Sequence, residues 1–174
     1  MIKKSLSEIN VNPFELFKKG NILLTAGDLN NRNSMTIGWG TIGYLFRKNV
    51  VIVYVKESRY TKHLMDEFEY FSISFLSDKY KKELAIMGTK SGKDIDKYKE
   101  TNLHLVYDID KKVSYIKESY LVFKLKKISD LKFDYDHIYD QDIVKNYYSG
   151  SEENNFHTMY IGEIVSCLVS ENEN

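Results

Sequence analysis

The sequence predicts a mostly β protein, a closed or partly closed β-barrel with two or three short helices. Apolar and polar residues alternate in about seven short runs, which is typical of antiparallel strands with one buried face. The helical patterns between these runs are short. No internal repeat or low-complexity segment occurs, and 174 residues suit one domain over 1–174, with an N-terminal arm at 1–19 and a polar tail at 169–174.

Composition and charge exclude several classes of function. The 25 basic residues balance 25 acidic ones, so the net charge favours neither nucleic acid nor an anionic membrane as partner. Cys167 is the single cysteine, and no Cys/His cluster has the spacing of a metal site. No apolar run approaches the roughly 18 residues of a membrane helix, and no apolar segment of a signal peptide follows Met1 to Ser5. We therefore expect a soluble cytoplasmic protein without a metal.

The first 42 residues predict a helix and two strands. Pro13, Phe14 and Phe17, with a stop at Gly20, indicate a helical turn after an extended arm. A short strand follows at 21–25, then a polar turn at 27–33. Residues 34–42 alternate as a strand, and one face of that strand is formed by Thr36, Gly38 and Gly40. Glycine weakens a strand unless another backbone or a ligand comes close, so this face is a candidate ligand wall.

Residues 50–68 predict a buried strand that leads into an amphipathic helix. The strand is the β-branched run 50–55, and the helix carries Tyr60, Leu64 and Phe68 at spacings of four. Between them, Ser58-Arg59-Tyr60-Thr61 places hydroxyls, a guanidinium and backbone N–H groups at a helix N-terminus. That combination suits an anion such as phosphate, although a serine N-cap beside an exposed arginine is equally ordinary.

The next segment predicts a strand, a helix and a second informative loop. The strand at 70–76 alternates, with Phe71, Ile73 and Phe75 on one face. Ser77-Asp78 caps a helix that ends at Gly88, and a brief helix is expected at 95–100. The loop Gly88-Thr89-Lys90-Ser91-Gly92-Lys93-Asp94 does not have the spacing of a P-loop. It is either two helix caps joined by a polar turn, or a set of amides, hydroxyls and ammonium groups for a phosphate or ribityl chain.

The second half predicts strands and one long connection. Short strands are expected at 103–107 and 113–116. The strand at 120–128 directs Leu121, Phe123 and Leu125 inward and Lys124 and Lys126 outward. Residues 129–155 are polar, with one helical turn near 142–147. A long strand at 156–168 ends the predicted barrel.

The remaining candidate residues carry little chemistry. Trp39, the only tryptophan, is expected either in the core or in the wall of a ligand site. His157 lies at the start of the last predicted strand and is a candidate for the mouth of a pocket. Cys167 in an apolar strand is expected to be a packed thiol. No Ser/His/Asp arrangement, carboxylate pair or metal spacing occurs, so the sequence predicts no catalytic side chain and no hydrolytic activity.

Three blocks of sequence resemble the flavin reductase-like, FMN-binding split-barrel family, in particular its flavoredoxin-like branch. They are Asn33 to Gly40, Ser58 to Thr61 and Gly88 to Asp94, and the segment Met159 to Val165 is similar to the closing strand of that family. The resemblance covers roughly residues 20–168. It implies a Greek-key split barrel, a homodimer and FMN bound near the subunit interface.

The resemblance also implies where the flavin binds. The expected cofactor-binding residues are Asn33, Ser34, Met35, Thr36, Trp39, Gly40, Thr41, Ser58, Arg59, Thr61, Gly88, Thr89, Ser91, Gly92 and Lys93. Within this set, the Ser58 turn would hold the phosphate and the Trp39 segment would line the rings. Two positions depart from the family pattern, because Glu57 replaces a proline before the Ser-Arg pair and Met87 replaces a cysteine before the glycine-rich loop. A carboxylate beside a phosphate is unfavourable unless it points away or pairs with a lysine.

The function implied by the resemblance is that of an FMN-dependent oxidoreductase, a flavin reductase-like enzyme that takes electrons from NAD(P)H. In such a protein the flavin performs the redox chemistry and the chain positions and tunes it. Two alternatives are a flavoredoxin-like FMN electron carrier that exchanges electrons with a redox protein, and a non-catalytic flavin-binding module.

Overall fold

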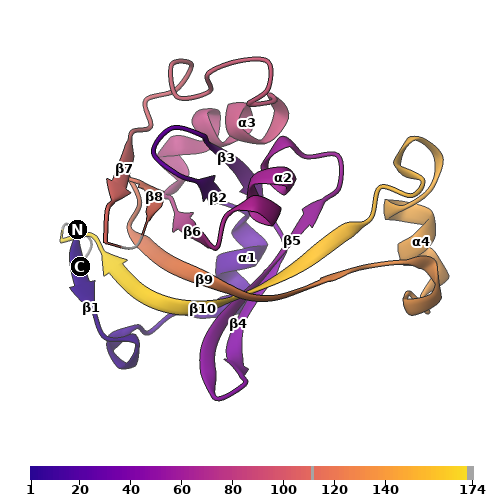
Figure 1. Cartoon of the computed structure of the whole chain (residues 1–174), viewed down its shortest axis with the longest axis horizontal. Coiled ribbons are helices and arrows are strands. Elements are labelled where there is room, and N and C mark those ends of the chain that lie inside the picture. Colours follow the sequence, from indigo (N-terminus) through magenta and orange to yellow (C-terminus); the bar gives the residue numbers. More distant parts are fainter. Residues whose placement is uncertain (111, 172–174) are drawn as a thin grey trace.

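The computed structural model describes residues 1–110 and 112–171, and most of its strands form one antiparallel sheet that curls around a core (Figure 1). The strand order is β3-β2-β6-β9-β10-β5-β4, with β1 beside β10, while β7 and β8 form a separate hairpin. The strands are β1 (Ile2–Lys4), β2 (Ile22–Gly27), β3 (Arg32–Ile37), β4 (Gly40–Leu45), β5 (Lys48–Lys56), β6 (Tyr70–Phe75), β7 (Leu105–Asp108), β8 (Val113–Ile116), β9 (Leu121–Lys132) and β10 (His157–Val169). The predicted mostly β class with short helices is confirmed.

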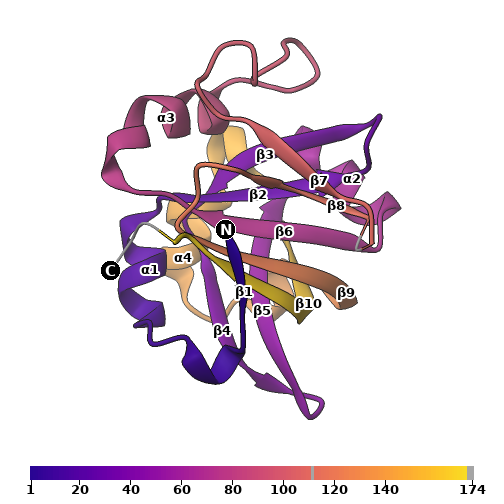
Figure 2. The same cartoon turned by 90° about the vertical axis from the view of Figure 1, so that its left-hand side faces the viewer.

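The expected strand at 34–42 is in fact two strands. It breaks at Gly38 and Trp39, and β3 and β4 lie at opposite ends of the sheet order. The chain crosses from one end of the curled sheet to the other at this break (Figure 2). Trp39 is therefore outside the sheet, and its side chain is 41% exposed.

The core confirms the predicted inward faces of two central strands. Phe71, Ile73 and Phe75 of β6 pack with Leu121, Phe123 and Leu125 of β9 in one buried cluster. Burial of such side chains is the main favourable term in folding.

The opposite face of these strands is also buried, because the β7–β8 hairpin covers it. Ser72 donates a hydrogen bond to the carbonyl of Ser114 at 2.7 Å. Lys124 was predicted to point outward, and it does lie on the face opposite the core, but the hairpin covers this face. Lys124 is buried, pairs with Asp108 and lies 4.7 Å from the ring centroid of Tyr115.

The helices flank the sheet. They are α1 (Pro13–Lys19), α2 (Tyr60–Glu67), α3 (Lys81–Thr89) and α4 (Gln141–Tyr147), with 3₁₀ turns η1 (Leu6–Glu8), η2 (Asp78–Tyr80), η3 (Tyr135–His137) and η4 (Gly150–Glu152). The predicted start and stop of α1 are confirmed, since Asn12 accepts a hydrogen bond from the N–H of Phe14 and Gly20 adopts the left-handed conformation at φ 68°. The predicted helical turn at 142–147 is confirmed as α4.

The predicted helix after Ser77 is present, with its end shifted by one residue, whereas a second predicted helix is absent. Ser77 is the N-cap of η2, which leads into α3, although its side chain makes no cap hydrogen bond, and α3 ends at Thr89 rather than at Gly88. The brief helix expected at 95–100 is a series of turns. This segment turns because Lys97 and Tyr98 both point inward, where they bond to β3 and α3. Asp94 consequently caps no helix.

Residues 133–156 form an arm that projects from the barrel between β9 and β10 and carries α4 (Figure 1). Polar contacts return the end of this arm to the barrel. The ammonium of Lys56 pairs with Glu152 at 2.6 Å, and Asn155 bonds to Ser58. The arm therefore brings residues distant in sequence to the end of β5. The predicted polar tail begins at the last residue of β10, and residues 172–174 lie outside the described part of the chain.

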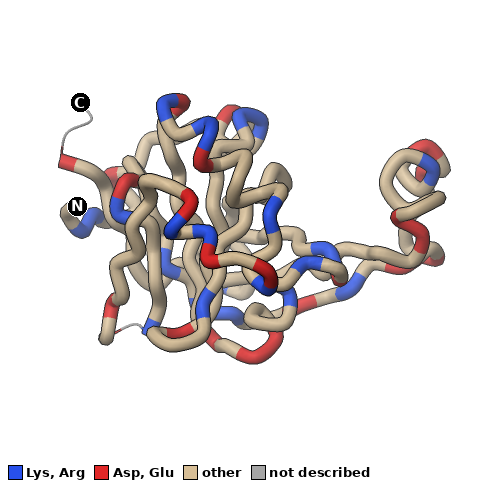
Figure 3. Tube along the Cα trace, turned by 90° about the horizontal axis from the view of Figure 1, so that it is seen from above, with Lys and Arg blue, Asp and Glu red and all other residues tan. Residues whose placement is uncertain are grey.

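Acidic and basic residues are interspersed over the barrel, whereas acidic residues predominate on the projecting arm (Figure 3). Among residues 1–110 and 112–171, no helix has the length and apolar character needed to cross a bilayer. The same residues contain no group of three or more His, Cys, Asp or Glu side chains arranged to hold a metal ion.

Candidate functional site

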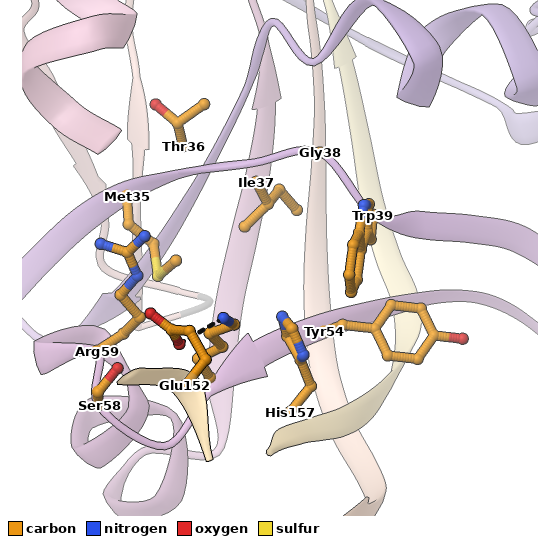
Figure 4. A pocket seen from close by; sticks show the side chains of 11 residues that line it. Met35, Thr36, Ile37, Gly38, Trp39, Tyr54, Ser58, Arg59, Glu152 and His157 are labelled. Carbon is orange, nitrogen blue, oxygen red and sulfur yellow. Dashed lines mark hydrogen bonds and ion pairs between the residues drawn. The ribbon is translucent and has the colours of Figure 1, made fainter. Parts of the chain in front are cut away.

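Two adjacent cavities lie between β3, β5, α2 and the end of the arm. The larger, about 340 Å³, is lined by residues 35–39 and by Tyr54, Lys56, Ser58, Arg59, Glu152 and His157 (Figure 4). The smaller, about 80 Å³, is lined by Asn33, Met35, residues 58–61, residues 87–92 and Lys97. We call them the Trp39 cavity and the Lys97 cavity. They share Met35, Ser58 and Arg59, so the two cavities lie on either side of these residues.

The turn before α2 supplies fewer free groups than the sequence predicted. The N–H of Ser58 donates to Asn155 Oδ1 at 3.0 Å, and the N–H of Arg59 donates to the carbonyl of Lys56 at 3.1 Å. Arg59, not Ser58, is the N-cap of α2. The first N–H groups of the helix, those of Tyr60 and Thr61, have no carbonyl acceptor within the helix. Ser58 Oγ accepts from Asn155 Nδ2 at 2.9 Å and keeps its own hydrogen to donate.

Three cationic residues line the Lys97 cavity. Two of them, Arg59 and Lys97, bond to backbone carbonyls, and the third, Lys90, is exposed. Arg59 Nη1 donates to the carbonyl of Gly88 at 3.2 Å. Lys97 is only 3% exposed, and its Nζ donates to the carbonyls of Ser34 at 2.9 Å and Met87 at 2.8 Å. Burial, followed by the charge of Arg59, lowers the pKa of Lys97 to about 8. Neither group forms an ion pair with a carboxylate of the described residues. A cavity with two unpaired cations favours an anion.

The glycine-rich loop is folded over Asn33. Asn33 Nδ2 donates to Thr61 Oγ1 at 2.8 Å, and this links β3 to the first turn of α2. A Cβ atom on Gly92 would lie 2.6 Å from Asn33 Cγ, so only glycine allows the loop to approach this closely. The loop, β3 and α2 therefore close together around the Lys97 cavity.

The structure gathers most of the predicted cofactor-binding residues at these cavities. Eleven of them line one or both: Asn33, Met35, Thr36, Trp39, Ser58, Arg59, Thr61, Gly88, Thr89, Ser91 and Gly92. Four lie elsewhere. Ser34 is buried against Thr25 and Tyr98, Gly40 lies under the ring of Phe17, and Thr41 and Lys93 are exposed outside both cavities.

Aromatic rings form one end of the Trp39 cavity. The indole of Trp39 lies 4.7 Å from the imidazole centroid of His157 and 5.0 Å from the ring centroid of Tyr147 on the arm. His157 is buried, and its Nδ1 lies 2.8 Å from the hydroxyl of Tyr148. Burial, followed by the charge of Lys56, lowers the pKa of His157 to about 4.

The low pKa of His157 predicts how stability depends on pH. Between pH 6.5 and pH 4 the unfolded chain binds a proton at this residue and the folded chain does not, so stability falls as the pH falls. We expect the unfolding free energy of the wild type to drop by about 2 kcal/mol more than that of His157→Gln between pH 7 and pH 5. Urea denaturation at both pH values measures this difference. Equal losses in the two proteins would contradict it.

Comparison with known proteins identifies the family. The family model described as "Flavin reductase like domain" matches residues 14–174. The chain belongs to this family. The resemblance drawn from the three sequence blocks is therefore confirmed.

Solved structures share the fold. Flavoredoxin of Desulfovibrio vulgaris (Miyazaki F) is 22% identical, with a TM-score of 0.66 over 98% of this chain and 78% of that one. An FMN-binding protein from Thermus thermophilus with bound p-hydroxybenzaldehyde is 17% identical. Its TM-score is 0.67, and the match covers 87% of this chain and 71% of that one. An NADH:FAD oxidoreductase from Streptomyces globisporus C-1027 is 12% identical, with a TM-score of 0.63 over 89% and 78%. No curated protein matches the chain in a sequence search. The split-barrel fold that the resemblance implied is confirmed.

The two departures from the family pattern have structural explanations. Glu57 accepts a hydrogen bond from Thr158 at 2.7 Å and lies 3.5 Å from Lys62 and 3.4 Å from Lys132. Burial raises its pKa, but Thr158 and the two lysines outweigh this effect and lower it overall. Its charge is thus neutralised outside both cavities. The Met87 side chain is fully buried in a second core cluster, and only its carbonyl reaches Lys97.

Sequence reasoning missed several residues that this flavin reductase-like chain brings to the cavities. Lys97 lies in a polar segment where nothing in the local pattern distinguishes a buried lysine from an exposed one. Lys56 and Glu152 are 96 positions apart and meet only because the arm folds back. Tyr54 lies within the predicted strand at 50–55, but alternation alone does not show which face borders a cavity.

Proposed function

We propose that this protein is an FMN-dependent oxidoreductase that accepts electrons from NADH or NADPH and passes them to an acceptor. The observation that carries the proposal is the pair of adjacent cavities. The small one is lined by Arg59 and Lys97, which pair with no carboxylate of the described residues, and the larger one lies beside Trp39. A dianionic phosphate suits the first, and the volume of the second is in the range of small-molecule sites.

The residues present fit this cofactor. Arg59 and Lys97 offer positive charge, Ser58 a hydroxyl hydrogen, and Tyr60 and Thr61 backbone N–H groups for the phosphate. The wall formed by residues 35–39 would face the flavin ring. Bound FMN itself would supply hydride acceptance and electron transfer, while the chain binds it, orients it and excludes water. We assign no side-chain acid or base to the reaction.

The names of the structural relatives support the choice of cofactor and donor. They include an FMN-binding protein, flavoredoxins and an NADH:FAD oxidoreductase. The flavoredoxins favour a second candidate function, an FMN electron carrier that exchanges electrons with a redox protein. We also propose, on the family resemblance, that the protein is a homodimer and, as the sequence predicted, that it is cytoplasmic.

The absorbance spectrum of the freshly purified protein, followed by anaerobic titration with NADH and with reduced ferredoxin, tests both candidates. A yellow protein that NADH reduces faster than ferredoxin supports the enzyme. Faster reduction by ferredoxin supports the carrier. A colourless protein that binds no added FMN contradicts both.

Arg59→Ala tests the phosphate assignment. Loss of one charge-assisted hydrogen bond should weaken FMN binding by roughly 1.5–3 kcal/mol. Titration of the apoprotein with FMN, followed by quenching of flavin fluorescence, measures the dissociation constant. Arg47→Ala, at the exposed turn between β4 and β5, is the matched control and should bind FMN like the wild type. Equal affinity in the two variants would place the phosphate elsewhere.

A further inference from the structure

Tyr148 and His157 form a buried pair between the arm and the Trp39 cavity. The Tyr148 side chain is 2% exposed, and its ring stacks on Phe156 with centroids 4.9 Å apart. Its hydroxyl reaches His157 Nδ1 at 2.8 Å. The imidazole is also held by Trp39, whose ring centroid lies 4.7 Å away. Contacts on two sides therefore fix the orientation of the imidazole.

The surroundings of the phenol decide which nitrogen of His157 carries the proton. Among the described residues, Nδ1 is the one acceptor within reach of the phenol hydrogen. A buried donor without an acceptor is costly, so the phenol donates to Nδ1. A neutral imidazole that accepts at Nδ1 carries its hydrogen on Nε2.

The Nε2 edge of His157 is directed to the cavity. His157 lines the Trp39 cavity, and Figure 4 shows its imidazole rising from the start of β10 toward Ile37 and Trp39. Within residues 1–110 and 112–171, Nε2 makes no hydrogen bond, and it is not one of the fully enclosed polar atoms. The cavity wall thus presents an N–H donor that the chain itself leaves unused.

We propose that Tyr148 is a positioning residue that holds His157 as an Nε2–H donor toward a conjugated carbonyl oxygen in the Trp39 cavity. The proposal rests on the flavin function proposed above, because the ligands of that function bear such carbonyls. One source is the flavin ring and the other is the nicotinamide carboxamide. A hydrogen bond from neutral imidazole suits either, and neither proton transfer nor charge on His157 is required.

The first test reads the tautomer in the apoprotein, where flavin binding plays no part. Long-range ¹H–¹⁵N correlation spectra should show His157 protonated on Nε2 in the wild type. Tyr148→Phe keeps the stacked ring and removes the hydroxyl, so the His157 signals should move toward a mixture of tautomers. Tyr135→Phe is the control, because its hydroxyl bonds to the backbone of Tyr148 and Asn154 and does not touch His157. A proton on Nδ1 in the wild type, or no change in Tyr148→Phe, would overturn the positioning role.

The second test identifies the carbonyl. In Tyr148→Phe, relative to Tyr135→Phe, we expect a rise of about 3- to 10-fold in one of two constants. A change in the FMN dissociation constant points to the flavin, and a change in the KM for NADH points to the nicotinamide. If FMN binds normally and neither constant differs between the two variants, the donor role is wrong while the proposed function stands. If the wild type binds no FMN, the proposed function and the donor role both fail.

Discussion

Lys97→Met is expected to weaken FMN binding by about 10- to 100-fold, while binding of riboflavin, which lacks the phosphate, changes little. The Lys97 ammonium is buried with two carbonyl acceptors and without a carboxylate partner in the described chain, so an anion in the adjoining cavity is its missing counter-charge. A hydrogen bond to a charged group contributes roughly 1.5–3 kcal/mol, which corresponds to the expected factor. Fluorescence titration of each apoprotein with FMN and riboflavin gives the ratio of the two affinities.

The pKa of Lys97 adds a pH dependence to this prediction. In the apoprotein its pKa is about 8, below the usual 10.5, so between these values the unfolded chain binds more protons and stability rises with pH. A bound phosphate favours the charged lysine and raises the pKa. FMN affinity should therefore fall as the pH rises above about 8 in the wild type and stay flat in Lys97→Met.

Lys93→Met is the matched control for Lys97→Met. Lys93 lies in the glycine-rich loop and is one of the cofactor-binding residues that the family resemblance implied, but its side chain is exposed and outside the Lys97 cavity. We expect Lys93→Met to bind FMN within a few-fold of the wild type, because exposed charges interact weakly across water. A larger loss in Lys93→Met than in Lys97→Met would reverse the assignment of the two lysines.

The sequence predicted the strands well where alternation reports a single buried face. Phe71 to Phe75 and Leu121 to Leu125 are examples, since the barrel core buries one side of each strand. Alternation did not predict the burial of Lys124. The β7–β8 hairpin covers the second face of the strand, and the local sequence pattern does not show that another part of the chain packs there. The burial of Lys97 was missed for a related reason. Its hydrogen-bond acceptors are backbone carbonyls of β3 and α3, which any sequence can provide.

The candidate site was predicted to a similar extent. The helix start after Ser58 and the glycine-rich loop were recognised and do meet at one cavity. The continuous strand through Gly38 and Gly40 was not correct, because closing the sheet requires the chain to leave one end and rejoin at the other. Glycines that alternate in sequence therefore do not share a strand face here, and they have different reasons to lack a side chain.

Gly38→Val and Gly40→Val should separate these two reasons. A Cβ atom on Gly40 would lie 2.6 Å from Phe17 Cζ and 2.8 Å from the carbonyl oxygen of Ile52. The missing side chain at Gly40 therefore makes room for Phe17 of α1 and not for a ligand. Gly38 has no atom within 4 Å of its ideal Cβ position, and it borders the Trp39 cavity. We expect Gly40→Val to lose about 2–3 kcal/mol of unfolding free energy through overpacking.

The expectation for Gly38→Val is the opposite, with stability within about 0.5 kcal/mol of the wild type and FMN binding weakened at least about tenfold. The branched side chain would occupy open space at the border of the Trp39 cavity, where the flavin ring is proposed to lie. Urea denaturation and FMN titration of both variants measure the two effects separately. Normal FMN affinity in Gly38→Val would show that the ring does not occupy the Trp39 cavity, whatever holds the phosphate. An undiminished stability in Gly40→Val would mean that Phe17 can leave its place against β4 without loss.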